Sequence, residues 1–134
     1  MRAATYVPPF GSKDATYIVV GEQPGRIEIL SGRPFAGPSG NELDDNLRMA
    51  GINKADCYFT NVIKDADHII DHYIAFNPRK GPSITEAGQK YINELATEID
   101  SCSGKIIIAM GNIALFALAD RTGVTKWRGS VIDP

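Results

Sequence analysis

The stretch YIVVGEQPG at residues 17–25 runs from four apolar residues through a glycine into a polar turn. A short apolar run of this kind, rich in β-branched residues and ended by Gly and Pro, predicts a buried strand followed by a tight turn. A second apolar run, CYFT at residues 57–60, ends in the same way at Asn61. Both runs therefore place polar side chains at the carboxyl edge of a predicted sheet, where open α/β folds bind their ligands.

Strand and helix patterns alternate along the whole sequence. We expect strands at 16–21, 57–63 and 105–110, helices at about 40–50, 84–100 and 112–121, and loops at 22–38 and 64–82. This alternation is typical of a parallel sheet covered by helices. The continuously apolar segment 105–110 is typical of a strand buried on both faces. The sequence therefore predicts an α/β fold, a three-layer domain with a central, mostly parallel sheet.

Two serine motifs predict where the first two long helices begin. Ser39-x-x-Glu42 and Ser83-x-x-Glu86 both have the pattern of a capping box. In a capping box the serine oxygen and the glutamate carboxylate accept hydrogen bonds from backbone amides that the helix leaves unpaired. We therefore expect Ser39 and Ser83 to cap these helices.

Length and composition indicate one ordinary domain, at residues 1–134, of which 43% are hydrophobic. No apolar run approaches the ~20 residues of a membrane span and no signal-peptide core is present, so we expect a cytoplasmic protein without a membrane partner. A net charge of −2 argues against a protein that coats DNA through many phosphate contacts. Basic residues nevertheless lie in or beside the loops of the predicted ligand edge: Arg26, Arg33, Lys64, Arg79, Lys80, Lys126 and Arg128.

Neither the cysteines nor the histidines form a strong metal motif. Cys57 and Cys102 lie far apart and outside any Cys-x-x-Cys pattern, so we expect reduced structural thiols. His68 and His72 have the i, i+4 spacing of metal ligands, but no clear third ligand accompanies them. We expect no metal and no cofactor. The loop 64–82 is longer than loops usually are in compact domains, so it is either functional or locally helical.

Three short segments follow the predicted strands or lie on the loops after them: GEQPG at 21–25, GRPFAGPSG at 32–40 and TNV at 60–62. They bring one carboxylate (Glu22), one aromatic ring (Phe35) and one side-chain amide (Asn61) to the same predicted edge. A planar ring with hydrogen-bonding edges, such as a nucleobase, is the ligand that this set of groups would recognise.

These segments resemble the uracil-DNA glycosylase superfamily, most closely its thermophile-type branch, family 4. That branch reads roughly Gly-Glu-Ala-Pro-Gly, then Gly-Arg-Pro-Phe-Val-Gly, then Thr-Asn-Val. The intervals of 13 residues from Glu22 to Phe35 and 26 residues from Phe35 to Asn61 match this pattern without gaps. Three motifs in order are more specific than any one alone. The resemblance implies a domain that flips uracil out of DNA and hydrolyses its N-glycosidic bond.

The resemblance implies roles for three residues near the first strand. Glu22 would activate water or stabilise the sugar cation, unless it merely lies at a strand end. Gln23 departs from the alanine of family 4 and stands where the most-studied branch has a catalytic aspartate. As a neutral amide it can position water but cannot act as a base. Glu28 matches a second acid of family 4, or is a salt-bridging surface residue.

The other motifs supply base-binding and phosphate-binding candidates. Phe35 would stack on the flipped uracil, or is a core aromatic between glycines. The Asn61 amide can donate to O4 and accept from N3–H of uracil, whereas cytosine presents the opposite polarity. The alternative for Asn61 is a turn residue bonded to its own backbone. Pro38, Ser39 and Gly40 at a helix start either offer backbone amides to a DNA phosphate or simply cap the helix.

The sequence departs from the family pattern in three ways. Family 4 has four cysteines that hold an iron–sulfur cluster, but Asp65 stands at one of these positions and no cysteine lies near Lys90, so we expect no cluster. A covalent-trapping relative has its reactive histidine at the position of Arg79, so we expect no covalent chemistry. The family's His-Pro-Ser motif would fall just past Pro134. We therefore expect residues 1–134 to belong to a longer polypeptide.

Two functions follow from this pattern. The first is a uracil-DNA glycosylase, a DNA-repair hydrolase, provided that the whole polypeptide contains the C-terminal motif. The second is a catalytically silent module that binds uracil or DNA, such as the N-terminal domain of a bacteriophage DNA polymerase. Losing one preorganised donor to a developing anion costs about 10²–10³ in rate, so we expect residues 1–134 alone to bind the base with little turnover.

Overall fold

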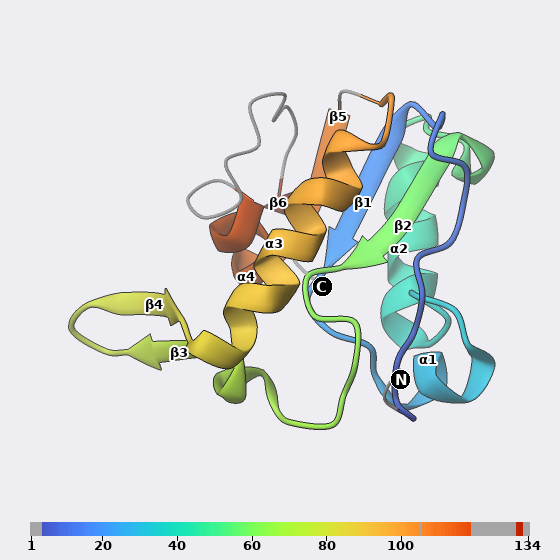
Figure 1. Ribbon diagram of the computed structural model, residues 1–134. Helices are drawn as coiled ribbons and strands as arrows, with labels where there is room; N and C mark the ends of the chain where they lie inside the picture. The colour runs from blue at the N-terminus through green and yellow to red at the C-terminus, as the bar shows by residue number, and fades with distance from the viewer. Residues whose placement is uncertain (1–3, 105, 119–130, 133–134) are drawn as a thin grey trace.

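The computed structural model describes residues 4–104, 106–118 and 131–132 (Figure 1). Its elements follow in the order β1 (Tyr17–Gly21), α1 (Arg26–Ser31), α2 (Pro38–Met49), β2 (Cys57–Asn61), β3 (Ile74–Asn77), β4 (Gly81–Ile84), α3 (Glu86–Asp100), β5 (Ile106–Met110), α4 (Asn112–Phe116) and β6 (Val131–Ile132). Two short 3-10 helices, Lys54–Asp56 and Ile70–His72, precede β2 and β3. None of the described helices is long and apolar enough to cross a membrane.

A four-stranded sheet with the order β2-β1-β5-β6 lies at the centre of the molecule. Every neighbouring pair of its strands is parallel. Tyr17 pairs with Cys57 on one side and with Ile106 on the other, so β1, β2 and β5 begin at the same edge. At the opposite, carboxyl edge, Gly21 lies beside Asn61. The predicted α/β fold with a parallel sheet is confirmed.

Helices cover both faces of this sheet (Figure 1). On one face, Leu43 and Leu47 of α2 pack against Val19 of β1, and their spacing of four places both on one side of the helix. On the other face, Ile18 of β1 packs with α3, which contributes Leu95 to the core. Neighbouring residues of β1 thus serve opposite layers, as the alternation of side chains along a strand requires.

The segment 22–38, predicted as a loop, contains the short helix α1. Glu28 closes its first turn, because its carboxylate Oε1 accepts a hydrogen bond from Gly25 N at 2.9 Å. Gly32 ends the helix with a φ of +75°, a left-handed conformation that glycine adopts without steric cost. The sequence analysis missed α1 because six residues are too few to show helical periodicity.

The prediction that Ser39 caps the first long helix is wrong. The N-cap of α2 is Gly37, and Pro38 is the first helical residue, so Ser39 already lies inside the first turn. Proline suits this position because the first helical N–H has no partner within the helix and because φ of proline is already close to the helical value.

The prediction that Ser83 caps the next helix is also wrong, because Ser83 pairs with Ala75 in a β-hairpin formed by β3 and β4. The helix α3 begins after Thr85, whose Oγ1 accepts a hydrogen bond from Gly88 N at 3.1 Å. The expected loop 64–82 is therefore largely structured, and its hairpin extends away from the sheet beside the start of α3 (Figure 1).

At the other end of the chain, the helix expected at about 112–121 is present as α4, Asn112–Phe116, and continues as a π-helical turn at 117–118. The rest of that expectation, at 119–121, lies outside the described residues. Lys126 and Arg128, expected beside the ligand edge, also lie outside them.

A substitution at Gly88 tests the close contact between α3 and the segment before the hairpin. A Cβ at this position would lie 2.0 Å from the backbone oxygen of Tyr73. We expect Gly88→Ala to lower the free energy of unfolding by about 1–3 kcal/mol because of overpacking, although alanine favours a helix over glycine. Urea unfolding measures the change. The control Lys90→Ala, at an exposed position of the same helix, should stay within about 0.5 kcal/mol. Equal stabilities of the two variants would contradict this close contact.

Candidate functional site

A cavity of about 240 Å³ opens at the carboxyl edge of the sheet, where β1, β2 and β5 end. Predicted site residues from three segments of the sequence line it: Glu22, Gln23, Glu28, Phe35 and Asn61. Gly21, Met110 and Gly111 line the remainder. The structure therefore brings the predicted carboxylate, aromatic ring and amide together in one place.

The absence of a side chain at Gly21 makes this convergence possible. A Cβ on Gly21 would lie 2.5 Å from Oδ1 of Asn61 and 2.7 Å from Cζ of Phe35. Real Cβ atoms do not approach other heavy atoms so closely, because the interiors of proteins are close-packed without overlap. Any larger residue at position 21 would therefore displace the amide, the ring or both.

Phe35 holds its ring at the cavity through an uncommon backbone conformation. Its φ is +55°, in the left-handed region that residues other than glycine seldom adopt. Such a conformation costs on the order of 1–3 kcal/mol and persists only where its surroundings enforce it. Gly40 leaves room for the Phe35 backbone, since a Cβ there would lie 1.8 Å from the Phe35 oxygen. The Phe35 ring also packs against Phe59, with 5.9 Å between the ring centroids.

Asn61 presents a free amide to the cavity. The residue is only 5% exposed, and within the described residues its side chain makes no hydrogen bond, while the cavity borders it. A polar group of this kind is costly to leave unpaired in the absence of water or a ligand. Its oxygen and nitrogen are therefore available to a ligand that offers one donor and one acceptor. Asn61 is not bonded to its own turn, which was the alternative interpretation.

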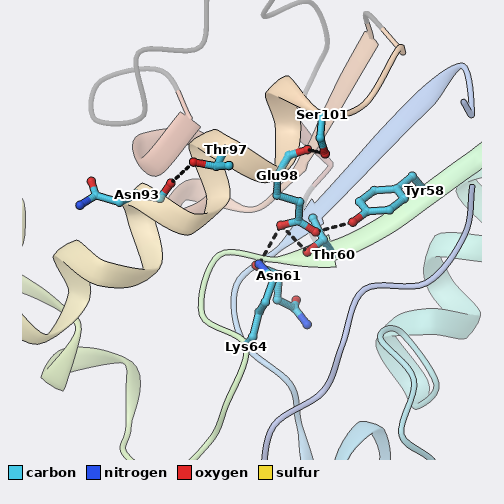
Figure 2. Close-up of polar contacts among 8 residues, drawn as sticks. All are labelled: Tyr58, Thr60, Asn61, Lys64, Asn93, Thr97, Glu98 and Ser101. Atoms are coloured by element: carbon cyan, nitrogen blue, oxygen red, sulfur yellow. Dashed lines mark hydrogen bonds and ion pairs between the residues drawn. The ribbon is translucent and has the colours of Figure 1, made fainter. Parts of the chain in front are cut away.

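A buried polar network holds the backbone of Asn61 (Figure 2). Lys64 Nζ donates to the Asn61 backbone oxygen at 2.9 Å and forms an ion pair with Glu98 Oε1 at 2.8 Å. Glu98 also accepts hydrogen bonds from the Tyr58 hydroxyl at 2.6 Å and the Thr60 hydroxyl at 3.1 Å. Burial, with the hydrogen bond to Glu98 as the next cause, raises the pKa of Tyr58 far above its usual range, which keeps the phenol protonated.

Lys64, one of the basic residues beside the predicted ligand edge, is neither part of a basic surface nor a solvated surface charge. Its side chain is 6% exposed and that of Glu98 is 10% exposed, so the two charges neutralise each other inside the protein. A buried ion pair of this kind needs further hydrogen bonds to offset desolvation, and the network supplies them. Lys64 therefore acts on the position of Asn61 and does not offer a free charge to a ligand.

Glu22 is the carboxylate that faces the cavity without a bonded partner among the described residues. It follows the last residue of β1, and its side chain is exposed. Partial burial of the carboxyl group raises its pKa, and the negative charge of Asp71 raises it further. Both causes act against the ionised form, so they make the Glu22 carboxylate a stronger base than an ordinary surface glutamate.

Gln23 and Glu28 also border the cavity, but other groups hold their polar atoms. Gln23 Nε2 donates to the backbone oxygens of Asp65 at 3.0 Å and His68 at 2.7 Å. The Glu28 carboxylate is buried and accepts from Gly25 N at 2.9 Å and from Gly37 N at 2.5 Å. Gln23 therefore ties β1 to the segment after β2, and Glu28 ties α1 to the start of α2. Their direct catalytic roles stay predictions.

A second buried carboxylate, Asp65, anchors the segment after β2 to α3. It accepts hydrogen bonds from the hydroxyls of Tyr73, at 2.7 Å, and Tyr91. Burial on its own would raise the pKa of Asp65, but the hydrogen bonds from Tyr91, Tyr73 and the backbone of Asp67 outweigh it and lower the pKa. Asp65 is one of the positions where the family resemblance implies a cluster cysteine, and here it forms part of a hydrogen-bonded cluster with the two tyrosines.

His68 and His72 do not line the cavity. Their rings stack on each other with centroids 3.9 Å apart, and both residues are exposed. In the described part of the chain, no group of three or more His, Cys, Asp or Glu side chains is arranged to hold a metal ion. Cys57 and Cys102 are both buried and are not joined in a disulfide.

The predicted phosphate site at the start of α2 has fewer donors than expected. Pro38 has no N–H, and the N–H of Gly40 donates to Gly37 O at 2.9 Å. Phosphate binding here stays a prediction that depends on the backbone of Ser39. The sequence analysis also missed Met110 and Gly111 as lining residues. Their place at the end of the apolar run 105–110, which completes the third strand of the same edge, is the signal that identifies them.

The ion pair behind Asn61 predicts a large effect on stability. Lys64→Met leaves the Glu98 carboxylate buried without its cation, so we expect the free energy of unfolding in urea to fall by about 3–5 kcal/mol. Adding Glu98→Gln should recover more than half of this loss because it removes the uncompensated charge. The control Lys54→Met breaks the exposed ion pair with Asp44 and should cost at most about 1 kcal/mol. Similar losses for Lys64→Met and Lys54→Met would contradict the buried pair.

Comparisons with known proteins agree with this geometry. The family model of the uracil DNA glycosylase superfamily matches residues 8–132. The chain is 30% identical over 133 residues to the type-4 uracil-DNA glycosylase of Archaeoglobus fulgidus, covering 96% of this chain and 62% of that protein. It is 32% identical over 126 residues to the corresponding protein of Thermotoga maritima, covering 92% and 60%. It is also 27% identical over 124 residues to a DNA polymerase of Bacillus phage SP01, covering 92% of this chain and 12% of the polymerase.

The chain thus spans about three fifths of the length of the two glycosylases that it matches. The family model, in contrast, covers almost all of the chain, including every segment that lines the cavity. The resemblance that the three motifs predicted is confirmed, and the chain belongs to the uracil-DNA glycosylase superfamily.

Proposed function

We propose that this protein excises uracil from DNA. The observation that carries the proposal is the convergence of Glu22, Phe35 and Asn61 on one cavity. Its volume of about 240 Å³ lies below the ~300–1,000 Å³ of pockets for drug-sized ligands and suits a single pyrimidine ring. The relatives described above as type-4 uracil-DNA glycosylases support the same substrate. We place the activity in the cytoplasm, in DNA repair.

Base recognition would use the Asn61 amide and the Phe35 ring, the two groups that approach Gly21. The Asn61 amide donates to O4 and accepts from N3–H of uracil, and it mismatches cytosine, which carries a donor and an acceptor in the reverse order. The ring of Phe35 stacks on the flipped base, a contact that contributes about 1–3 kcal/mol per base. The fixed backbone of Asn61, held by Lys64, keeps the amide in place before the base arrives.

The chemical step would use Glu22. The bond between N1 of uracil and C1′ of deoxyribose breaks, and its electron pair leaves with the base, while the oxygen of water forms a bond to C1′. Ionised Glu22 accepts the proton of this water or stabilises the positive charge that develops on the sugar. The proton released by the water, through Glu22 or through solvent, ends on N1 of the departing uracil anion, which leaves Glu22 ionised again. The products are neutral uracil and an abasic site, and no metal ion takes part in these steps.

A second candidate function is a silent uracil- or DNA-binding domain joined to a DNA polymerase. The observation that favours it is the similarity to the phage SP01 polymerase, in which the matching region makes up 12% of the whole chain. Base recognition by Phe35 and Asn61 would be the same in both functions. The two differ in turnover, so an activity measurement separates them.

Uracil-containing single-stranded DNA, incubated with the full-length polypeptide that includes these residues, should acquire abasic sites that break on alkali treatment. We expect Asn61→Asp to lower the rate about tenfold to a hundredfold, because a carboxylate cannot donate to O4 and one hydrogen bond is lost. Asn93→Asp, an exposed site on α3, is the matched control and should keep the wild-type rate. Preferential binding of uracil DNA without abasic sites would favour the silent domain. Equal binding of uracil-containing and control DNA, without salt dependence and without abasic sites, would refute both functions.

The raised pKa of Glu22 predicts the pH dependence of this reaction. Glu22 must be ionised to act, so the rate falls as the pH drops through its pKa. Asp71→Asn removes a negative charge that raises this pKa, so the pKa falls and the acidic limb of the pH–rate profile moves to lower pH. The control Asp100→Asn, at the far end of α3, should leave the limb in place. If the acidic limb of the pH–rate profile does not move in Asp71→Asn, Asp71 does not affect the pKa of Glu22.

A further inference from the structure

A second cavity, of about 220 Å³, lies next to the first, and Phe35 lines both of them. Its other walls include Phe10, Arg33, Lys54 and Phe59. Aromatic rings and cations thus surround a space of nearly the same size as the base cavity. None of the roles considered so far uses this space.

The aromatic wall is built by the segment before β1. Phe10 is fixed against the edge of β2, because its N–H donates to Phe59 O at 2.9 Å and its oxygen accepts from Phe59 N at 2.8 Å. The residue is nevertheless 45% exposed. A large apolar ring on an ordered backbone at the surface contributes stacking area at a reduced entropic cost on binding.

The cationic wall is Arg33, from the loop between α1 and α2. Its guanidinium carbon lies 4.3 Å from the centroid of the Phe10 ring. Among the described residues Arg33 has no carboxylate partner. A guanidinium stacked on a ring keeps its N–H groups directed outward in its plane, where they can donate in pairs to a phosphate.

The charge of the cavity favours an anion. Asp44 is the acidic residue in its wall, and Lys54 Nζ lies 3.0 Å from Asp44 Oδ1, so these two charges offset each other. The charge of Arg33 remains. The space therefore combines apolar rings with one net positive charge, which matches a nucleotide, whose flat base and negative phosphate need both.

We propose that this second cavity binds the nucleotide next to the uracil in the same DNA strand. The neighbouring base lies against the Phe10 and Phe35 rings, and Arg33 donates to its phosphate. The shared wall at Phe35 makes occupants of the two cavities neighbours, as consecutive nucleotides are. Because rings contact the flat face that every base has, the site accepts any neighbouring base. This inference depends on the proposed function, in that the first cavity takes the uracil.

The test compares deoxyuridine with the trinucleotide d(TpUpT) as probes, with dissociation constants measured by calorimetry or NMR titration. For the wild-type protein the trinucleotide should bind at least about fivefold more tightly. Arg33→Gln and Phe10→Leu should each remove most of this gain and leave the affinity for deoxyuridine unchanged. Arg33→Gln should also weaken the salt dependence of trinucleotide binding, since one phosphate contact is lost. The control Lys90→Gln, an exposed cation on α3, should change neither affinity.

The outcomes separate the two proposals. Deoxyuridine that fails to bind the wild-type protein would refute the base cavity and the proposed function with it. If deoxyuridine binds but d(TpUpT) gains nothing, or if both variants bind d(TpUpT) as the wild type does, the second cavity is not a nucleotide site. Asn61→Ala is the contrasting variant, since it should lower the affinity for both probes by the same factor. Thermal unfolding shows whether each variant folds. If Phe10→Leu does not fold, the affinities of Arg33→Gln alone decide whether the second cavity binds a nucleotide.

Discussion

The arrangement of the whole site depends on the space left by one missing side chain, at the end of β1. The parallel register places Gly21 directly beside Asn61, and the Phe35 ring approaches Gly21 from the loop between α1 and α2. A methyl group at Gly21 would lie within 2.7 Å of both neighbours. The sheet thus determines which residues meet, and the glycine determines how closely they meet. A slip in register would destroy the cavity even if every motif residue were retained.

The polar residues around the cavity divide into two kinds. The side chains of Glu22 and Asn61 border it with no hydrogen-bond partner among the described residues, so they can act on a ligand. Glu28, Lys64 and Asp65 are buried and bonded on several sides, so they hold backbone segments in place. Unpaired groups and the left-handed backbone of Phe35 lower stability, and the buried networks offset this cost. Preorganisation of this kind is what a binding site needs before its ligand arrives.

Local patterns in the sequence predicted β1 and β2, because apolar runs ended by glycine or asparagine form short buried strands. Regular spacing of the motifs also predicted which residues meet at the cavity. The ion pair between Lys64 and Glu98 could not be predicted, since it joins residues on different elements, 34 positions apart. The hydrogen bond from Gly37 N to the Glu28 carboxylate could not be predicted from the sequence for the same reason. The prediction that Ser83 caps a helix was wrong because Ser83 pairs with Ala75 in the hairpin, which competes with the local capping-box motif.

Two supports from the segment after β2 therefore act on different side chains of the site. The segment after β2 bonds to Gln23 through the backbone of Asp65 and His68, and it carries the Asp71 charge that raises the pKa of Glu22. The ion pair of Lys64 instead fixes the backbone of Asn61. A change in the first support would alter the pKa of the Glu22 carboxylate, and a change in the second would alter the position of the Asn61 amide. Among the described contacts no residue of one support bonds to the side chain that the other affects, although Lys64 and Asp65 are neighbours in the sequence.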